Sequence, residues 1–106
     1  EIPVLYHGER LYHYASPHIH VTRVADGRVV QKLRYEDVRV MQIYADRLYV
    51  CTNDIYILDL NTYDILDVIR LSRALVDRLV FGEHDPTGGT FILSKMSREV
   101  LVFEGG

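Results

Sequence analysis

Three histidines lie close together near the start of the chain, in the segment His13-Tyr-Ala-Ser-Pro-His18-Ile-His20. If two strands meet at the Ser-Pro turn, His18 and His20 share one face, and His13 lies on the paired strand. Three imidazoles on one face could bind zinc and leave a coordination position open, as catalytic zinc sites do. The simpler interpretation is that these histidines pack within the fold or lie at its rim. A metal-dependent or catalytic protein is therefore an alternative, with His13, His18 and His20 as its candidate ligands.

Other arrangements that could support catalysis are weaker. The glycines of Asp85-Pro-Thr-Gly-Gly lack the spacing of a phosphate-binding loop and indicate a turn. The aspartates are spread over turns and strand ends, where their side chains favour local backbone hydrogen bonds. Cys51 lies inside an apolar run, which suits a small buried side chain. The sequence thus favours a protein that is not an enzyme, and it indicates no cofactor.

Composition limits the classes of protein. With 106 residues, 48% of them hydrophobic and 25% charged, the chain can build one globular core or part of a larger one. A formal net charge of -3 argues against a nucleic-acid partner, because phosphate binding favours a basic surplus. No apolar run approaches the roughly 20 residues that span a bilayer, so we expect no membrane partner. The single cysteine fits a reducing compartment, and we expect an intracellular, cytoplasmic protein.

The apolar residues come in short runs rich in Val, Ile, Leu and Tyr, separated by Gly, Asp, Asn, Ser and Pro. This pattern predicts strands and turns, hence an all-β fold. Helical spacing competes only over residues 65–79, where the repeat described below favours strands. The expected strands are Ile2 to Tyr6, Arg10 to Tyr14, His18 to Val24, Val29 to Leu33, Val38 to Tyr44, Leu48 to Thr52, Ile55 to Leu60, Ile65 to Leu71, Val76 to Phe81, Thr90 to Ser94 and Val100 to Phe103.

The sequence repeats itself at roughly 40 residues, a period typical of stacked or radial folds. Leu11-Tyr12 corresponds to Leu48-Tyr49, and Ile19-His20-Val21 to Ile55-Tyr56-Ile57. We therefore expect a single repeat segment of three units, approximately residues 1–35, 36–71 and 72–106. The first two units read as consecutive four-stranded antiparallel meanders, and the third stops after its third strand.

Val38 to Ile69, VRVMQIYADRLYVCTNDIYILDLNTYDILDVI, resembles one blade of a WD-repeat or related β-propeller. Leu58-Asp59 stands where that family has its Trp-Asp dipeptide, and the chain contains no tryptophan. The resemblance implies propeller-like blades, about two and three quarters of them, whereas closed propellers have typically four to eight. We therefore expect a homo-oligomer or a fragment of a larger propeller. A β-sandwich is the structural alternative.

The resemblance also implies a function and a binding face. Propeller loops present binding surfaces on a rigid scaffold, which favours a protein-protein interaction or scaffold module, with a structural or assembly subunit as an alternative. In the blade layout, the turns after the second and fourth strands of each unit share one face. That face carries Arg34, Tyr35, Arg39, Arg70 and Arg73. Because arginine pairs well with carboxylate and phosphate, we expect a protein or peptide partner with an acidic or phosphorylated segment.

Overall fold

The computed structural model describes residues 2–71, 76–81, 90–94 and 99–103, with side chains for residues 2–71, 78 and 79. Every regular element in these residues is a strand, so the all-β prediction is confirmed. No helix in this part of the chain is long and apolar enough to cross a membrane. The strands are β1 (Leu5–His7), β2 (Arg10–Ala15), β3 (His18–Arg23), β4 (Val29–Arg34), β5 (Val40–Tyr44), β6 (Arg47–Cys51), β7 (Ile55–Asp59), β8 (Ile65–Ile69), β9 (Val76–Phe81), β10 (Thr90–Ser94) and β11 (Glu99–Phe103).

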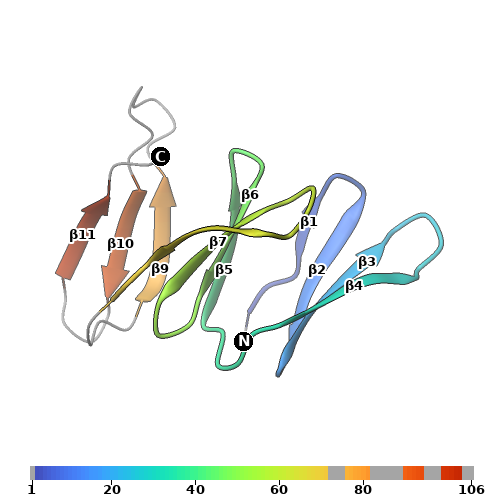
Figure 1. Cartoon of the computed structure of the whole chain (residues 1–106), viewed down its shortest axis with the longest axis horizontal. Helices are drawn as coiled ribbons and strands as arrows, with labels where there is room; N and C mark the ends of the chain where they lie inside the picture. Colours follow the sequence, from blue (N-terminus) through green and yellow to red (C-terminus); the bar gives the residue numbers. More distant parts are fainter. Residues whose placement is uncertain (1, 72–75, 82–89, 95–98, 104–106) are drawn as a thin grey trace.

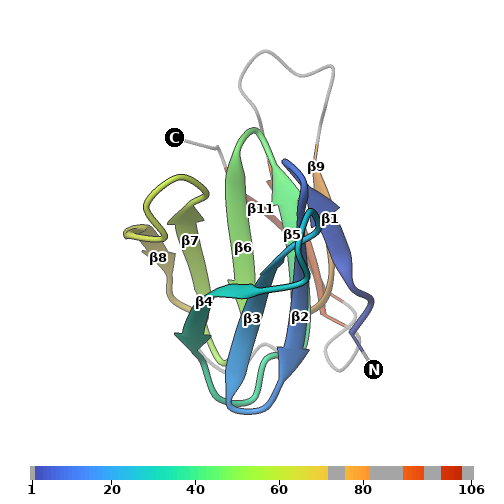
Figure 2. The same cartoon turned by 90° about the vertical axis from the view of Figure 1, so that its right-hand side faces the viewer.

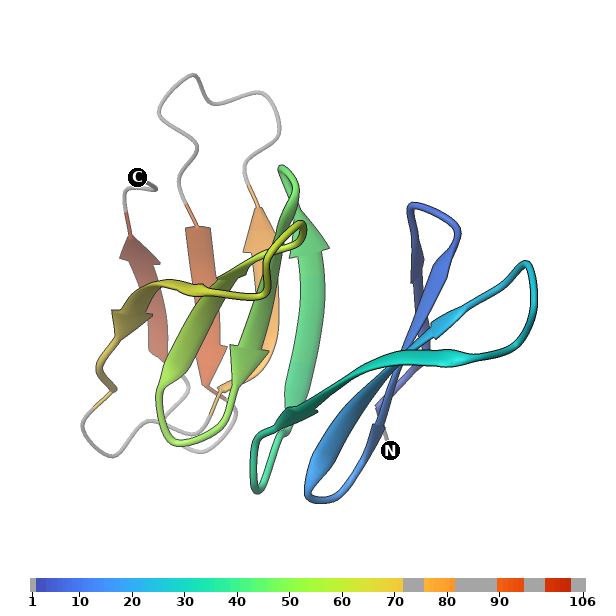
Figure 3. The same ribbon diagram turned by 45° about the vertical axis from the view of Figure 1, so that its right-hand side comes forward.

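The strands form three antiparallel sheets, each built from strands that are consecutive in the chain (Figure 1). β1–β4 form the first sheet, β5–β8 the second, and β9–β11 a three-stranded third sheet. The sheets contact one another mainly through their first strands, β1 against β5 and β5 against β9. β4 and β8 lie at the far edges of their sheets (Figures 2 and 3). This side-by-side arrangement is that of neighbouring propeller blades and not that of a two-sheet sandwich.

The pairing of strands repeats between the first and second sheets. Tyr12 pairs with Val21 in the first sheet, and the equivalent Tyr49 pairs with Ile57 in the second. Each sheet also shifts register directly after the second member of this pair, between its third and fourth strands. The repeat in the sequence therefore corresponds to a repeat in backbone geometry.

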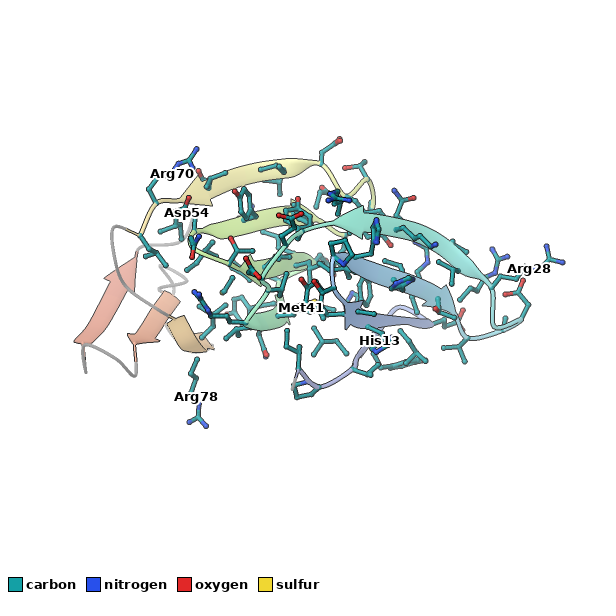
Figure 4. The ribbon with its side chains drawn as sticks, turned by 90° about the horizontal axis from the view of Figure 1, so that it is seen from below. His13, Arg28, Met41, Asp54, Arg70 and Arg78 are labelled. Carbon is teal, nitrogen blue, oxygen red and sulfur yellow. The ribbon has the colours of Figure 1, made fainter. Side chains whose placement is uncertain are left out.

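The two middle strands of the second sheet, β6 and β7, are buried on both faces, which explains why they read as continuous apolar runs. Tyr12 of the first sheet belongs to the core between the first and second sheets, whereas its equivalent Tyr49 lies on the opposite face of the second sheet. The face that carries Tyr12 in the first sheet and Tyr49 in the second is thus directed toward the next sheet along the chain. Met41 lies inside the core between the first and second sheets (Figure 4). The first core contains Tyr12, Ile19, Val21, Val38, Met41, Leu48, Val50, Leu58 and Leu60. The second contains Tyr49, Cys51, Ile55, Ile57, Leu71 and Leu79.

One hydroxyl group fastens the linker between the first and second sheets. Tyr14 Oη donates to the carbonyl of Tyr35 at 2.8 Å and accepts from the N–H of Val38 at 3.3 Å. The N–H of Tyr35 in turn donates to the carbonyl of Pro17 at 3.0 Å. These bonds satisfy backbone groups that leave the strand ladders at the linker, as partly buried polar groups require.

A second tyrosine joins the same two sheets at their other end. Tyr63 lies in the β7–β8 turn with φ of 63°, and Gly27 has φ of 71° at the equivalent position of the β3–β4 turn. A left-handed conformation costs a residue with a Cβ about 1–2 kcal/mol. The side chain of Tyr63 makes contacts that offset this cost: its Oη accepts from Arg10 Nη1 at 2.8 Å and lies 3.3 Å from Tyr12 Oη. Burial, together with this contact, raises the pKa of Tyr12 far above its ordinary value, so its phenol stays protonated.

Several strand ends differ from their expected positions because of bonds that local sequence does not reveal. β1 begins at Leu5 and not at Ile2, and Pro3 has no N–H to pair. β5 begins at Val40 because the N–H of Val38 bonds to Tyr14. β8 ends at Ile69, and the N–H of Leu71 bonds to a carboxylate. The strand interpretation of residues 65–79 holds at β8 and β9, while the turn expected at residues 85–89 lies outside the described residues.

Replacing Tyr14 with Phe tests the linker contact. The change removes the hydroxyl and leaves a carbonyl and an N–H unpaired at a partly buried position, which costs about 1–3 kcal/mol in the free energy of unfolding. Denaturant unfolding of the whole protein measures this loss. Tyr6→Phe is the matched control, because Tyr6 is 64% exposed and its change should stay within about 0.5 kcal/mol. Equal stability of the two variants would show that the hydroxyl does not fasten the linker.

Candidate functional site

The turns and linkers at one end of the sheets form what we call the linker end. It is made by the β2–β3 turn, the linker 35–39 between the first and second sheets, and the β6–β7 turn. The meander topology brings these segments together, because alternate turns of an antiparallel sheet lie at the same end. The binding residues predicted from sequence end or follow β4, precede β5 or follow β8, which places the described ones at this end.

A groove of about 340 Å³ opens at the linker end, at the junction of the first and second sheets. Arg34 ends β4, and Tyr35 and Glu36 begin the linker. Thr52 and Tyr56 line the groove from the second sheet. The rings of Tyr35 and Tyr56 lie 5.3 Å apart at 55°, an aromatic contact that holds the floor of the groove. The groove therefore combines an arginine, a carboxylate, a hydroxyl and two aromatic rings.

Arg34 is the cation of this groove. Its Nη2 atom donates to Glu36 Oε1 at 2.9 Å, and the two side chains are 66% and 65% exposed. An ion pair between such exposed groups contributes about 0–1 kcal/mol. A ligand carboxylate or phosphate could replace Glu36 at little cost. Burial raises the pKa of Tyr35 above its ordinary value, so its phenol is a neutral hydrogen-bonding group.

The other arginines predicted for this site do not enter the groove. Arg39 donates from Nη1 to the carbonyl of Thr52 at 3.4 Å and also lines a separate pocket beside β1 and β9. Arg70 pairs with Asp54 at 3.0 Å (Figure 4). Arg73 lies outside the described residues. The described arginines share one end of the sheets, as the sequence predicted, but they lie in different surroundings there.

Asp54 binds both the side chain of Arg70 and the backbone of Leu71. Its carboxylate accepts from the N–H of Leu71 at 3.0 Å as well as from Arg70. The Leu71 hydrogen bond, followed by that of Arg70, lowers the pKa of Asp54 despite its partial burial. The carboxylate therefore stays ionised and ties the β6–β7 turn to the end of β8.

Glu36, Thr52 and Tyr56 belong to the groove but were missed from sequence. Tyr56 is at the position equivalent to His20, so the repeat suggested only a packing role for it. Its neighbour across the groove, Tyr35, comes from a different unit. Proximity between two units follows from the way sheets pack, and single-sequence patterns contain no signal for that distance.

The three histidines lie on the face of the first sheet that points away from the second sheet. His13 pairs with His20 across β2 and β3, with ring centroids 6.3 Å apart, and His18 lies 6.0 Å from His20. Within the described residues, no group of three His, Cys, Asp or Glu side chains is placed to hold a metal ion. His13 is exposed, and the alignment of the two sheets places His13 and His20 at positions where the second sheet has Val50 and Tyr56.

Cys51 fits the interpretation made from its sequence surroundings. It is fully buried at the end of β6, and burial raises the pKa of its thiol to about 12. A thiol protonated at neutral pH is a poor nucleophile. Cys51 therefore acts as a small core residue.

Comparison with known proteins supports the fold and little more. No family model matches the chain, and no curated protein is similar to it in sequence. The structure is similar to the crystal structure of Saccharomyces cerevisiae Sqt1, a WD-repeat protein, with a TM-score of 0.75 and 16% sequence identity. The match covers 92% of this chain and 28% of the Sqt1 chain. The propeller-like interpretation of the blades is thus supported, and the chain spans about a quarter of that neighbour.

The histidine face predicts a pH effect on stability. Desolvation lowers the pKa of His20, with further lowering by Lys32, His18 and His13. A histidine with a lowered pKa binds fewer protons in the folded protein than in the unfolded chain, so its stabilising effect is present above the unfolded pKa and is lost as pH falls. The temperature of the unfolding midpoint should therefore decrease when the pH is lowered from about 7.5 to about 5.5.

A matched pair of variants assigns the pH effect. Lys32→Gln removes a positive charge beside His20 and should reduce the fall in midpoint, whereas Arg28→Gln, an exposed change in the β3–β4 turn, should leave it unchanged. Asp26 and Asp54 do not change their charge over this pH range, because their pKa values are lowered below the ordinary value for aspartate. An identical fall in all three proteins would remove His20 as the cause.

Proposed function

We propose that the chain is part of a protein-interaction module, and that the groove beside Arg34 and Tyr35 receives an acidic or phosphorylated peptide segment. The observation that carries the proposal is the groove itself, in which an exposed arginine lies beside a tyrosine fixed by its backbone and its ring contact. Arginine and tyrosine are enriched among the residues that dominate protein interfaces. The propeller-like fold is a rigid scaffold on which such loops are held in place.

Arg34 is the residue that would recognise the negative charge of the ligand. A guanidinium group donates to two oxygens of a carboxylate or phosphate at once. Its present partner, Glu36, competes for the same donors. A ligand anion would replace this weak surface pair, and the ring of Tyr35 would lie against the neighbouring part of the peptide.

Arg39 and Arg70 add positive charge around the groove, but Asp54 offsets the charge of Arg70. Association with further sheets, from another copy or from a larger chain, is supported by the outer face of the first sheet, which no described residue covers. Cytoplasmic location and the assembly role rest on the sequence.

A peptide-binding measurement with charge variants tests the proposal. The probes are three fluorescent peptides of one neutral sequence that differ at a single central position, which is glutamate, phosphoserine or glutamine. Arg34→Glu should weaken binding of the two charged peptides by about tenfold or more, since a hydrogen bond to a charged group contributes about 1.5–3 kcal/mol. Glu36→Gln should strengthen binding, because it removes the competing carboxylate.

Arg28→Glu is the control with the same change of charge. Arg28 is exposed at the tip of the β3–β4 turn, far from the groove (Figure 4). Its change should leave binding nearly constant. Equal weakening by Arg28→Glu and Arg34→Glu would indicate a general charge effect and would overturn the assignment to the groove, as would undiminished binding by Arg34→Glu.

A further inference from the structure

A second pocket, of about 270 Å³, lies at the end of the sheets opposite the linker end. It opens between the first and second sheets, where the β1–β2, β5–β6 and β7–β8 turns come together. Its polar lining consists of His7, Arg10, Tyr12, Asp46 and Asn61.

Two tight hairpins shape the mouth of the pocket. Gly8 and Glu9 have φ of 57° and 61°, and Ala45 and Asp46 have φ of 49° and 58°. Two consecutive left-handed residues are the mark of the hairpin turn whose twist matches that of its strands. The turns place His7 Nε2 of the first sheet 3.6 Å from Asp46 Oδ1 of the second. The rim of the pocket is therefore built by both sheets.

Arg10 is held in place by a tyrosine hydroxyl group. Its Nη1 atom donates to Tyr63 Oη at 2.8 Å, and that oxygen lies 3.3 Å from Tyr12 Oη. Tyr12 is 1% exposed and forms the base of the pocket, whereas Arg10 is half-buried. Within the described part of the chain, no carboxylate forms an ion pair with Arg10, whereas Arg23, Arg34 and Arg70 each have one.

A guanidinium group carries five N–H donors, and one phenol oxygen satisfies only one of them. Half-burial also makes an arginine costly to leave without an anion, because fewer water molecules can solvate its charge. The fixed guanidinium of Arg10, the tyrosine hydroxyl beside it and the small volume together suit a compact anion with two oxygens in one plane. That description fits a carboxylate.

We propose that this pocket binds the side-chain carboxylate of a glutamate or aspartate in a partner protein. The volume of about 270 Å³ lies just below the range of about 300–1,000 Å³ for sites that enclose a drug-sized molecule, and it leaves room for one acidic side chain. Asp46, at the mouth, disfavours a doubly charged phosphate more strongly than a singly charged carboxylate. This site is separate from the groove at the linker end and does not depend on it.

Titration with three short peptides, followed by NMR, tests the site. The peptides carry one glutamate, one glutamine or one phosphoserine in the same neutral sequence, and the signals observed are the backbone amides of Gly8 and Asn61 and the Nε–H of Arg10. We expect saturable shifts with the glutamate peptide, weaker binding of the phosphoserine peptide and no saturation with glutamine. Free glutarate serves as a small dicarboxylate, and saturation by glutarate alone would assign the site to small molecules and overturn the partner-protein assignment.

Variants separate charge from position. Arg10→Gln should weaken binding of the glutamate peptide by about tenfold or more, and Arg28→Gln, an exposed change at the same end, should leave it unchanged. Tyr63→Phe keeps the charge of Arg10 but removes its acceptor, so it should give a smaller loss. Because the linker-end groove also receives negative charge, each titration is repeated in the Arg34→Glu background, where the shifts at Gly8 and Asn61 should persist.

Asp46→Asn provides a second test of the site in case Arg10→Gln fails to fold. This change lies on an exposed turn and removes the negative charge at the mouth, so the glutamate peptide should bind more tightly. Stronger binding to the phosphoserine peptide than to the glutamate peptide, or no gain with Asp46→Asn, would contradict the carboxylate assignment. Equal losses in Arg10→Gln and Arg28→Gln would show that net charge, and not this pocket, governs the binding.

Discussion

The fold depends on covering both faces of the second sheet. In β6, Leu48 and Val50 belong to the core shared with the first sheet, while Tyr49 and Cys51 belong to the opposite core. Each such side chain contributes about 1.5–3 kcal/mol when fully buried, so the sheet would be unstable with either face in water. Side-by-side stacking satisfies this requirement, and it explains why equivalent faces of successive units always look in the same direction. The packing then fixes where the two ends of the sheet junction lie.

Tyrosine hydroxyls complete the junction that apolar packing creates. Tyr14 bonds to the linker at one end, and Tyr63 bonds to Arg10 beside Tyr12 at the other. These tyrosines supply polar contacts between units at the two ends of the junction. Both candidate sites lie at this junction and take lining residues from both sheets.

The strands could be predicted because their signal is local: apolar runs and turn residues specify them, and the repeat confirms their order. The ends of the strands could not be predicted, because the N–H groups of Val38 and Leu71 bond to the side chains of Tyr14 and Asp54 from other elements. The same limit applies to the sites. The sequence predicted that Arg34 and Arg70 lie at one end of the sheets, but the pairing of Arg70 with Asp54 depends on residues 16 positions apart in the sequence. Arg10 was missed because its partner, Tyr63, is 53 positions away.

Each candidate site takes residues from two sheets, and this links binding to sheet packing. The linker-end groove needs Arg34 from β4 and Tyr56 from β7, and the opposite pocket needs Arg10 from β2 and Asp46 from the β5–β6 turn. A ligand that binds only the packed arrangement stabilises it, by an amount that grows with the logarithm of ligand concentration. Because such coupling is reciprocal, a ligand at one end that tightens the junction favours the arrangement that the other end requires. The Tyr14 and Tyr63 contacts are the elements through which that coupling would act, since each joins a site to the shared core.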